Sequence, residues 1–154
     1  MDISPLTLQP LLRPGSDLNG CAVAERCSID FLINQCSLLN TLVTAGGDHS
    51  DYMSCFVKGF PEANDLSCAR LLLREPAGTE SGRVLLYVCP ECGDISCGAY
   101  SVQVSQSDDG FTWYAFAYEN GYEEPVIIDG VGPFAFEKHA YEATIINAAR
   151  LMKE

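Results

Sequence analysis

The chain has 154 residues, of which 47% are hydrophobic and 19% charged, and its formal net charge at pH 7 is −12. This hydrophobic content excludes a largely disordered chain, and the length suffices for one domain with a single core. The excess of carboxylates argues against binding to nucleic-acid phosphates, and the same charge would repel an anionic membrane surface.

Apart from a C-terminal helix, the helices are predicted to lie mostly in the first half of the chain. Residues 1–20 contain three prolines and two glycines, so we expect an extended segment with one short strand at Leu6–Leu8. Apolar residues recur at helical spacing over 31–42, which predicts a first helix capped by Ser28 or Asp30. A second, shorter helix is predicted over 66–73.

From Arg83 onward the pattern changes to that of an antiparallel sheet. Val84–Cys89 is an apolar run typical of a buried strand, and polar and apolar residues alternate over Gly98–Gln106. A tight turn at 108–110 would connect this second strand to a third at Phe111–Tyr118. Simple alternation places Trp113 on the opposite face of that third strand from Phe116.

The last part of the chain is predicted to add a short strand and a helix. Val126–Ile128 could pair as a further strand, and Lys138–Lys153 carries apolar residues at steps of three and four. The predicted fold is therefore one α+β domain over residues 1–154. It has an antiparallel β-meander in the C-terminal half, packed against helices that include a C-terminal helix.

The N-terminal residues show no basic region followed by an apolar run, and the chain has no apolar run of about 18 residues. We therefore expect a cytoplasmic protein without a membrane span. In that compartment the eight cysteines would be reduced thiols rather than disulfides.

The most acidic part of the chain lies between Val84 and Glu137. This stretch contains nine carboxylates and no lysine or arginine, and it is rich in aromatic residues. Aromatic side chains anchor many protein interfaces, and carboxylates beside them steer and pair with the basic side chains of a partner. We therefore expect a structured acidic surface that binds a basic protein. The candidate partner-binding residues are Asp108, Asp109, Tyr118, Glu119, Tyr122, Glu123 and Glu124.

The sequence favours a binding protein over an enzyme. It lacks the G-x-S-x-G, H-E-x-x-H and P-loop motifs, and neither His49 nor His139 belongs to a recognisable nucleophile motif. A small acidic protein of this kind is typical of an immunity protein that neutralises a basic nuclease toxin. That is our leading hypothesis, and it involves no catalytic residue and no cofactor.

The alternative hypothesis is a small zinc-binding or thiol-dependent protein. Cys89 and Cys92 have the C-x-x-C spacing that lets two thiolates converge on one tetrahedral ion, and Cys97 could be a third ligand. A fourth ligand would have to be His139, Cys55 or a carboxylate. The C-x-x-C pair is also the spacing of redox-active thiols, although a strand rather than a helix is predicted after it.

Four segments in the last 70 residues form a specific combination. They are Leu85–Ala99, which contains C-P-E-C-G-D-I-S-C-G, then Tyr118–Tyr122, Gly132–Phe136 and Tyr141–Glu142. In this combination the chain resembles a family of small uncharacterised bacterial proteins. The resemblance implies one domain and a bacterial origin, and it transfers no catalytic residue.

Overall fold

The computed structural model describes residues 2–13, 25–46, 49–90 and 98–153, and these form an α+β fold with two antiparallel sheets. The smaller sheet contains β1 (Leu6–Arg13), β2 (Arg26–Ile33) and β3 (Cys36–Ser37). The larger sheet contains, in spatial order, β4 (Met53–Ser54), β5 (Val84–Val88), β6 (Ala99–Gln106), β7 (Gly110–Glu119) and β8 (Val126–Ile127), and β9 (Phe134–Glu137) pairs with the start of β7. The helices are α1 (Leu38–Gly46), α2 (Pro61–Leu71) and α3 (Lys138–Leu151).

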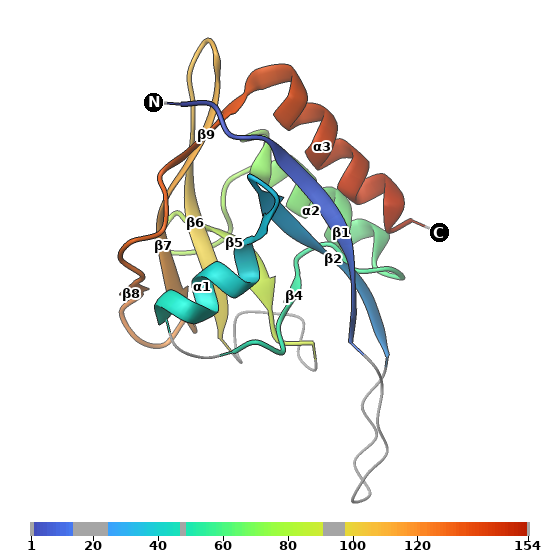
Figure 1. Ribbon diagram of the computed structural model, residues 1–154. Coiled ribbons are helices and arrows are strands. Elements are labelled where there is room, and N and C mark those ends of the chain that lie inside the picture. Colours follow the sequence, from blue (N-terminus) through green and yellow to red (C-terminus); the bar gives the residue numbers. More distant parts are fainter. Residues whose placement is uncertain (1, 14–24, 47–48, 91–97, 154) are drawn as a thin grey trace, which may run out of the picture.

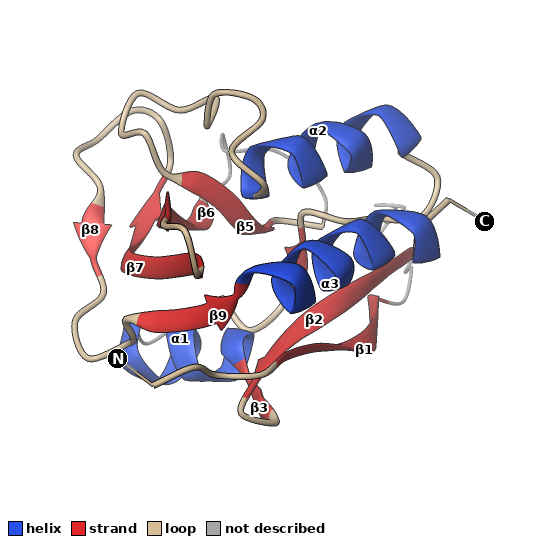
Figure 2. Cartoon of the chain, turned by 90° about the horizontal axis from the view of Figure 1, so that it is seen from above, coloured by secondary structure: helices blue, strands red, loops and turns tan. Residues whose placement is uncertain are grey.

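The predicted meander and C-terminal helix are confirmed. β5, β6 and β7 follow one another in the chain and in the sheet, each antiparallel to the next, and β8 continues the order (Figure 1). α3 begins after Glu137, whose side chain accepts a hydrogen bond from the Ala140 N–H at 2.6 Å. That bond lowers the pKa of the Glu137 carboxyl and satisfies one of the free N–H groups at the start of the helix. Figure 2 shows α2 and α3 lying side by side.

The predicted helix over 31–42 is wrong in its first part, because Arg26–Ile33 forms β2. The buried apolar residues Ile29, Phe31 and Ile33 occupy alternate positions, which is the spacing of a strand. Over such a short run, the apolar residues fit strand spacing as well as they fit helical spacing. Left-handed backbone at Asn34 and Gln35 then turns the chain, and the helix begins only at α1.

The predicted strand at Leu6–Leu8 is longer than expected, since β1 continues to Arg13. It pairs with β2 along its whole length, with Pro10 opposite Ile29. Proline is tolerated there because β1 is an edge strand. The helix predicted over 66–73 is present as α2, but it begins earlier, with Pro61 in the first turn where proline is favoured.

A β-bulge in β7 overturns the expectation that Trp113 and Phe116 face opposite sides. Ala115 has a φ of 52°, and the pairing with β6 shifts register between Ser101 and Gln103. The extra residue returns the following side chain to the inner face, so Trp113 and Phe116 are both buried while Tyr114 is 40% exposed. The bulge therefore adds a second large aromatic side chain to the core.

Phe31 lies at the centre of the core. Its ring makes edge-to-face contacts with Phe56, Tyr87 and Trp113 at centroid distances of 6.2, 5.9 and 5.5 Å. Beside it, the buried Asp30 carboxylate accepts a hydrogen bond from the Tyr87 hydroxyl at 2.5 Å. Desolvation and this carboxylate raise the pKa of Tyr87, so the hydroxyl remains a donor. The two sheets are thus joined by both apolar and polar contacts.

A hydrogen-bonded relay connects the sheet to both long helices. The Trp113 indole Nε1 donates to the Tyr141 hydroxyl at 3.0 Å, and that hydroxyl donates to the Leu71 carbonyl at 2.7 Å. Trp113 lies in β7, Tyr141 in α3 and Leu71 at the end of α2.

No helix in the described ranges is long and apolar enough to cross a membrane.

We predict that Tyr141→Phe lowers the free energy of unfolding by about 1–3 kcal/mol, because it leaves a buried indole N–H and a buried carbonyl without their partner. Urea unfolding followed by circular dichroism would measure the change. Tyr114→Phe is the matched control, and it should change the stability by less than about 0.5 kcal/mol because Tyr114 is exposed. Equal effects of the two substitutions would contradict the relay.

Candidate protein-binding surface

The seven candidate partner-binding residues do not form one surface, because they are divided between the two ends of β7. Asp108 and Asp109 are exposed in the turn before β7, whereas Glu119 is its last residue. A strand of ten residues is roughly 30 Å long. One small interface could therefore contain the residues at one end or those at the other.

Two of the candidates, Tyr118 and Glu119, are directed inward. Glu119 is 5% exposed, and its carboxylate accepts hydrogen bonds from the Ser101 hydroxyl at 2.5 Å and the Ser81 hydroxyl at 2.9 Å. Tyr118 is half-buried and stacks on His49, with ring centroids 4.8 Å apart and planes 3° from parallel. These two residues therefore support the loop that follows β7.

Tyr122, Glu123 and Glu124 lie in that loop, between β7 and β8, and all three are exposed. Tyr122 is 79% exposed. The Asn120 side-chain oxygen accepts hydrogen bonds from the backbone N–H groups of Tyr122 and Glu123, at 2.9 and 3.0 Å. An Asn side chain that bonds in this way fixes a turn, so the loop presents its tyrosine and carboxylates in a defined arrangement.

The structure adds an apolar component that the sequence analysis did not include. β8 pairs on one side with β7 and ends the sheet, and its residues Val126 and Ile127 are 60% and 47% exposed. Two apolar residues directly after Glu123–Pro125 were the sequence feature that could have indicated them. Asp129, which follows, is also exposed.

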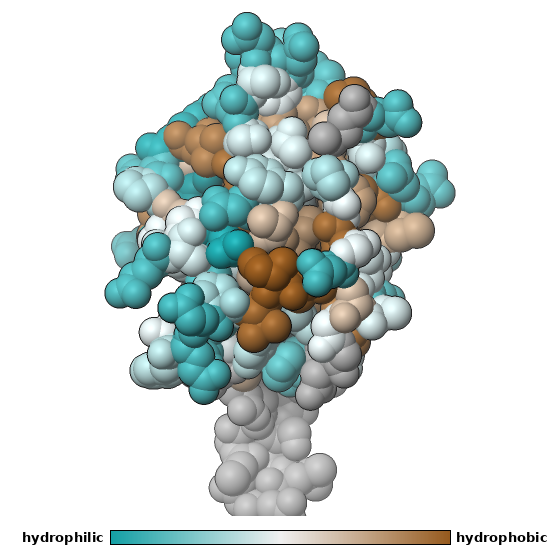
Figure 3. All heavy atoms as spheres, turned by 90° about the vertical axis from the view of Figure 1, so that its left-hand side faces the viewer, coloured by the Kyte–Doolittle hydropathy of each residue, from teal (hydrophilic) through white to brown (hydrophobic). Residues whose placement is uncertain are grey.

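We call this region the β8 surface and define it by Tyr122, Glu123, Glu124, Val126, Ile127 and Asp129. Figure 3 shows the side of the molecule on which β8 lies, with an apolar patch bordered by hydrophilic residues. An apolar centre with a charged rim is the usual anatomy of a protein interface. Apolar patches rimmed by polar residues are typical of sites that bind other molecules.

Two hollows adjoin the β8 surface. One, of ≈ 460 Å³, is lined by residues that include Glu80, Glu119, Glu123 and Glu124 together with Tyr122. The other, of ≈ 350 Å³, is lined by aromatic rings, by β8 residues and by Asp129. Carboxylates and tyrosine faces both attract guanidinium and ammonium groups, so each hollow suits a basic side chain.

The rings in the second hollow are those of His49, Tyr100 and Tyr118. His49 also stacks on Tyr52 at a centroid distance of 4.9 Å. Desolvation, and then the hydrogen bond with Tyr118, raise the pKa of Tyr52, which keeps that phenol neutral. Tyr52 is buried, so it supports His49 from within rather than lining the hollow.

The carboxylates of the β8 surface are not neutralised within the part of the chain that the structure describes. The ion pair found there joins His139 to Glu142 on α3, at 3.9 Å. No lysine or arginine occurs between Val84 and Glu137, the stretch that supplies the whole surface. The negative charge of these carboxylates at an exposed apolar edge favours encounter with a basic partner.

The structure describes only one of the three cysteines on which the zinc or thiol alternative depends. Cys92 and Cys97 lie outside the described residues, Cys89 is buried at the end of β5, and the described residues contain no group of three potential metal ligands. His139 follows β9, which pairs with the start of β7. Cys89 follows β5, whose end pairs with the start of β6, and the start of β6 pairs in turn with the end of β7. These ends are roughly 30 Å apart, so His139 and Cys89 cannot bind the same ion.

No protein-family model, curated protein or solved structure matches the chain.

We predict that Glu119→Ala lowers the free energy of unfolding by about 1–3 kcal/mol, because two serine hydroxyls lose their shared acceptor. Glu124→Ala, an exposed carboxylate in the same loop, is the matched control and should change it by less than about 0.5 kcal/mol. Thermal and urea unfolding would measure both. A Glu119→Ala protein as stable as the Glu124→Ala protein would refute a supporting role for Glu119.

We predict that Cys55 is an unreactive thiol at neutral pH. Desolvation raises its pKa to about 12 from 9.0. At neutral pH, its thiolate fraction is therefore roughly a thousandfold lower than that of an unperturbed cysteine. Because the raised pKa favours the neutral thiol in the folded state, its contribution to stability is present below pH 9 and decreases as the pH rises toward 12. Mass spectrometry after iodoacetamide treatment should find the exposed Cys36 modified well before Cys55. Faster labelling of Cys55 would overturn the prediction.

Proposed function

We propose that the chain is a protein-binding domain that inhibits a basic protein, and that it does so through the β8 surface. The observation that carries the proposal is an exposed apolar edge strand, Val126–Ile127, set between Glu123–Glu124 and Asp129. The proposed partner is a nuclease-type toxin, which would make the chain an immunity protein.

The proposed mode of binding follows from the two parts of the surface. Val126 and Ile127 would lie against an apolar area of the partner and exclude water from the contact. Burial of these apolar side chains would contribute to the affinity, since the removal of apolar area from water is favourable. Tyr122 would act as an anchor, since tyrosine is among the residues that dominate binding energy.

The carboxylates would determine which partner is chosen. A nuclease binds the phosphates of its substrate through arginine and lysine side chains. Closely spaced carboxylates also attract these side chains. Glu123 and Glu124 would therefore pair with the same cations that the substrate needs, and binding would exclude the substrate. Attraction between the opposite fields would also accelerate association at low ionic strength.

The first experiment is affinity purification of the tagged chain from its own host at low salt, with intact-mass analysis of the bound protein. A stoichiometric basic protein is expected, and its nuclease activity should fall in proportion to added chain until the two are equimolar. A chain that purifies alone under these conditions, or a bound protein whose activity is unchanged, would refute the proposal.

We predict that Glu123→Lys/Glu124→Lys weakens binding to this partner at least tenfold, about 1.4 kcal/mol, because two attractive charges become repulsive. The matched control is Asp108→Lys/Asp109→Lys, which changes the net charge equally at the other end of β7 and should weaken binding less than threefold. Isothermal titration calorimetry at two salt concentrations would measure both. Equal losses would show that net charge alone determines the affinity.

A further inference from the structure

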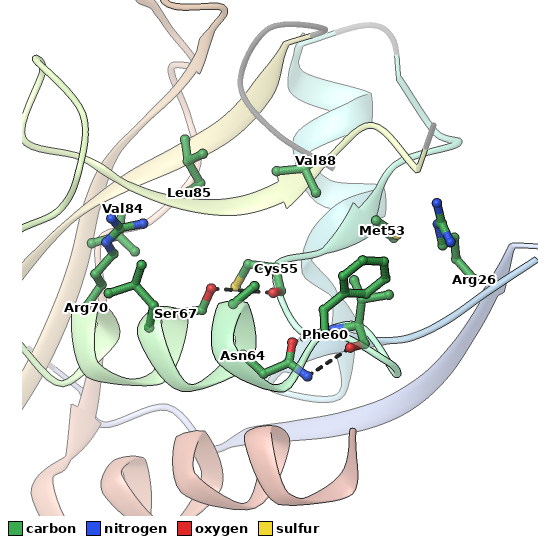
Figure 4. Close-up of a pocket in the computed structure, with 13 residues that line it drawn as sticks. Arg26, Met53, Cys55, Phe60, Asn64, Ser67, Arg70, Val84, Leu85 and Val88 are labelled. Atoms are coloured by element: carbon green, nitrogen blue, oxygen red, sulfur yellow. Dashed lines mark hydrogen bonds between the residues drawn. The ribbon is translucent and has the colours of Figure 1, made fainter. Parts of the chain in front are cut away.

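A second candidate site lies at the opposite edge of the larger sheet from the β8 surface. It is a groove of ≈ 330 Å³ between α2 and the strands β4 and β5. Its volume falls within the range of small-molecule sites. Figure 4 shows Val84, Leu85 and Val88 of β5 along one side and the residues of α2 along the other.

The interior of the groove is apolar. Met53 and Phe60 line it together with the three β5 residues. The polar side chains of Asn64 and Ser67 already have partners: Asn64 bonds the N–H and the carbonyl of Val57 at 2.8 Å each, and the Ser67 hydroxyl donates to the Cys55 carbonyl at 3.4 Å. From Phe60 to Arg70 the groove follows α2 for about 15 Å. It is therefore long enough for an extended apolar chain.

An arginine lies at each end of the groove, Arg26 at one and Arg70 at the other (Figure 4). The Arg26 guanidinium lies 5.4 Å from the centre of the Phe60 ring, and its Nε donates to the Pro90 carbonyl at 3.2 Å. The Arg70 Nε donates to the Pro76 carbonyl at 3.2 Å. Each guanidinium is thus held in place by its Nε and retains terminal N–H groups for a ligand.

Arg26 and Arg70 are the charged residues among the described residues that line the groove, and that lining contains no carboxylate. Within the residues that the structure describes, neither Arg26 nor Arg70 forms an ion pair with a carboxylate. Two cations beside an apolar groove whose lining contains no carboxylate favour a ligand with an anionic head group.

We propose that the groove binds a small amphipathic carboxylate, a molecule with an unbranched apolar chain and an anionic head group. The chain lies along Val84, Leu85 and Val88, and the carboxylate accepts hydrogen bonds from the guanidinium of Arg26 or Arg70. The apolar interior selects against small hydrophilic anions, and the arginines select against amines and alcohols of the same length. The site is separate from the β8 surface and does not depend on the proposed function.

The test is calorimetric titration of the full chain with decanoate below its micellar concentration. Saturable 1:1 binding is expected, with decylamine and decanol binding at least tenfold more weakly and acetate not measurably. Absence of saturable decanoate binding would overturn the proposal. Equal affinity for decanol would also overturn it, because the arginines would then have no part in recognition.

Substitutions at the groove would test where decanoate binds. Arg26→Gln/Arg70→Gln should weaken decanoate binding at least tenfold, whereas Arg150→Gln, an exposed arginine on α3, should change it less than twofold. Ala63→Phe, at an exposed position in the groove, should block binding without affecting the core. It serves as a second variant if the double substitution unfolds the chain. Wild-type affinity in folded Ala63→Phe protein would overturn the location.

Discussion

The layers of this fold are joined where the ring of Phe31 contacts Tyr87 and Trp113. Phe31 belongs to the smaller sheet and the other two residues to the larger one, so this contact determines how the sheets sit against each other. Trp113 continues the connection through Tyr141 to the end of α2. Because every ring in the series is buried and each polar atom in it has a partner, the arrangement permits little adjustment.

The two proposed binding regions lie outside this rigid centre, at the two edges of the larger sheet. At one edge β8 is short, apolar and surrounded by carboxylates. At the other edge β4 is equally short, and α2 lies beside β5 to form the groove. The charges at the edges are opposite in kind, since carboxylates border β8 and arginines end the groove. The larger sheet thus separates the carboxylates of the β8 surface from the two arginines of the groove.

The second half of the fold could be predicted from sequence because its determinants are local. The Asp108–Gly110 turn, the apolar run of β5 and the spacing in α3 each specify their element within a few residues. β2 could not be predicted in this way. Its apolar residues also fit helical spacing, and the choice is made by pairing with β1, a contact between distant residues that a local pattern does not contain.

The same distinction applies to the candidate site. The exposed loop with Tyr122, Glu123 and Glu124 was accessible to sequence reasoning because acidic and aromatic residues gather there. The inward direction of Glu119 depends on Ser81 and Ser101, which come from other parts of the chain. The separation of Asp108 from Glu119 depends on β7 being one continuous strand. Neither could be read from composition.

The position of Trp113 has a practical consequence. The chain contains a single tryptophan, and its indole is fully buried between the sheet and α3. Its fluorescence therefore comes from one site, and the emission of a desolvated indole shifts to longer wavelength when water reaches it. Both proposed binding regions lie at the edges of the sheet, away from this ring. The protein thus carries an intrinsic optical probe that distinguishes loss of the core from occupation of either edge.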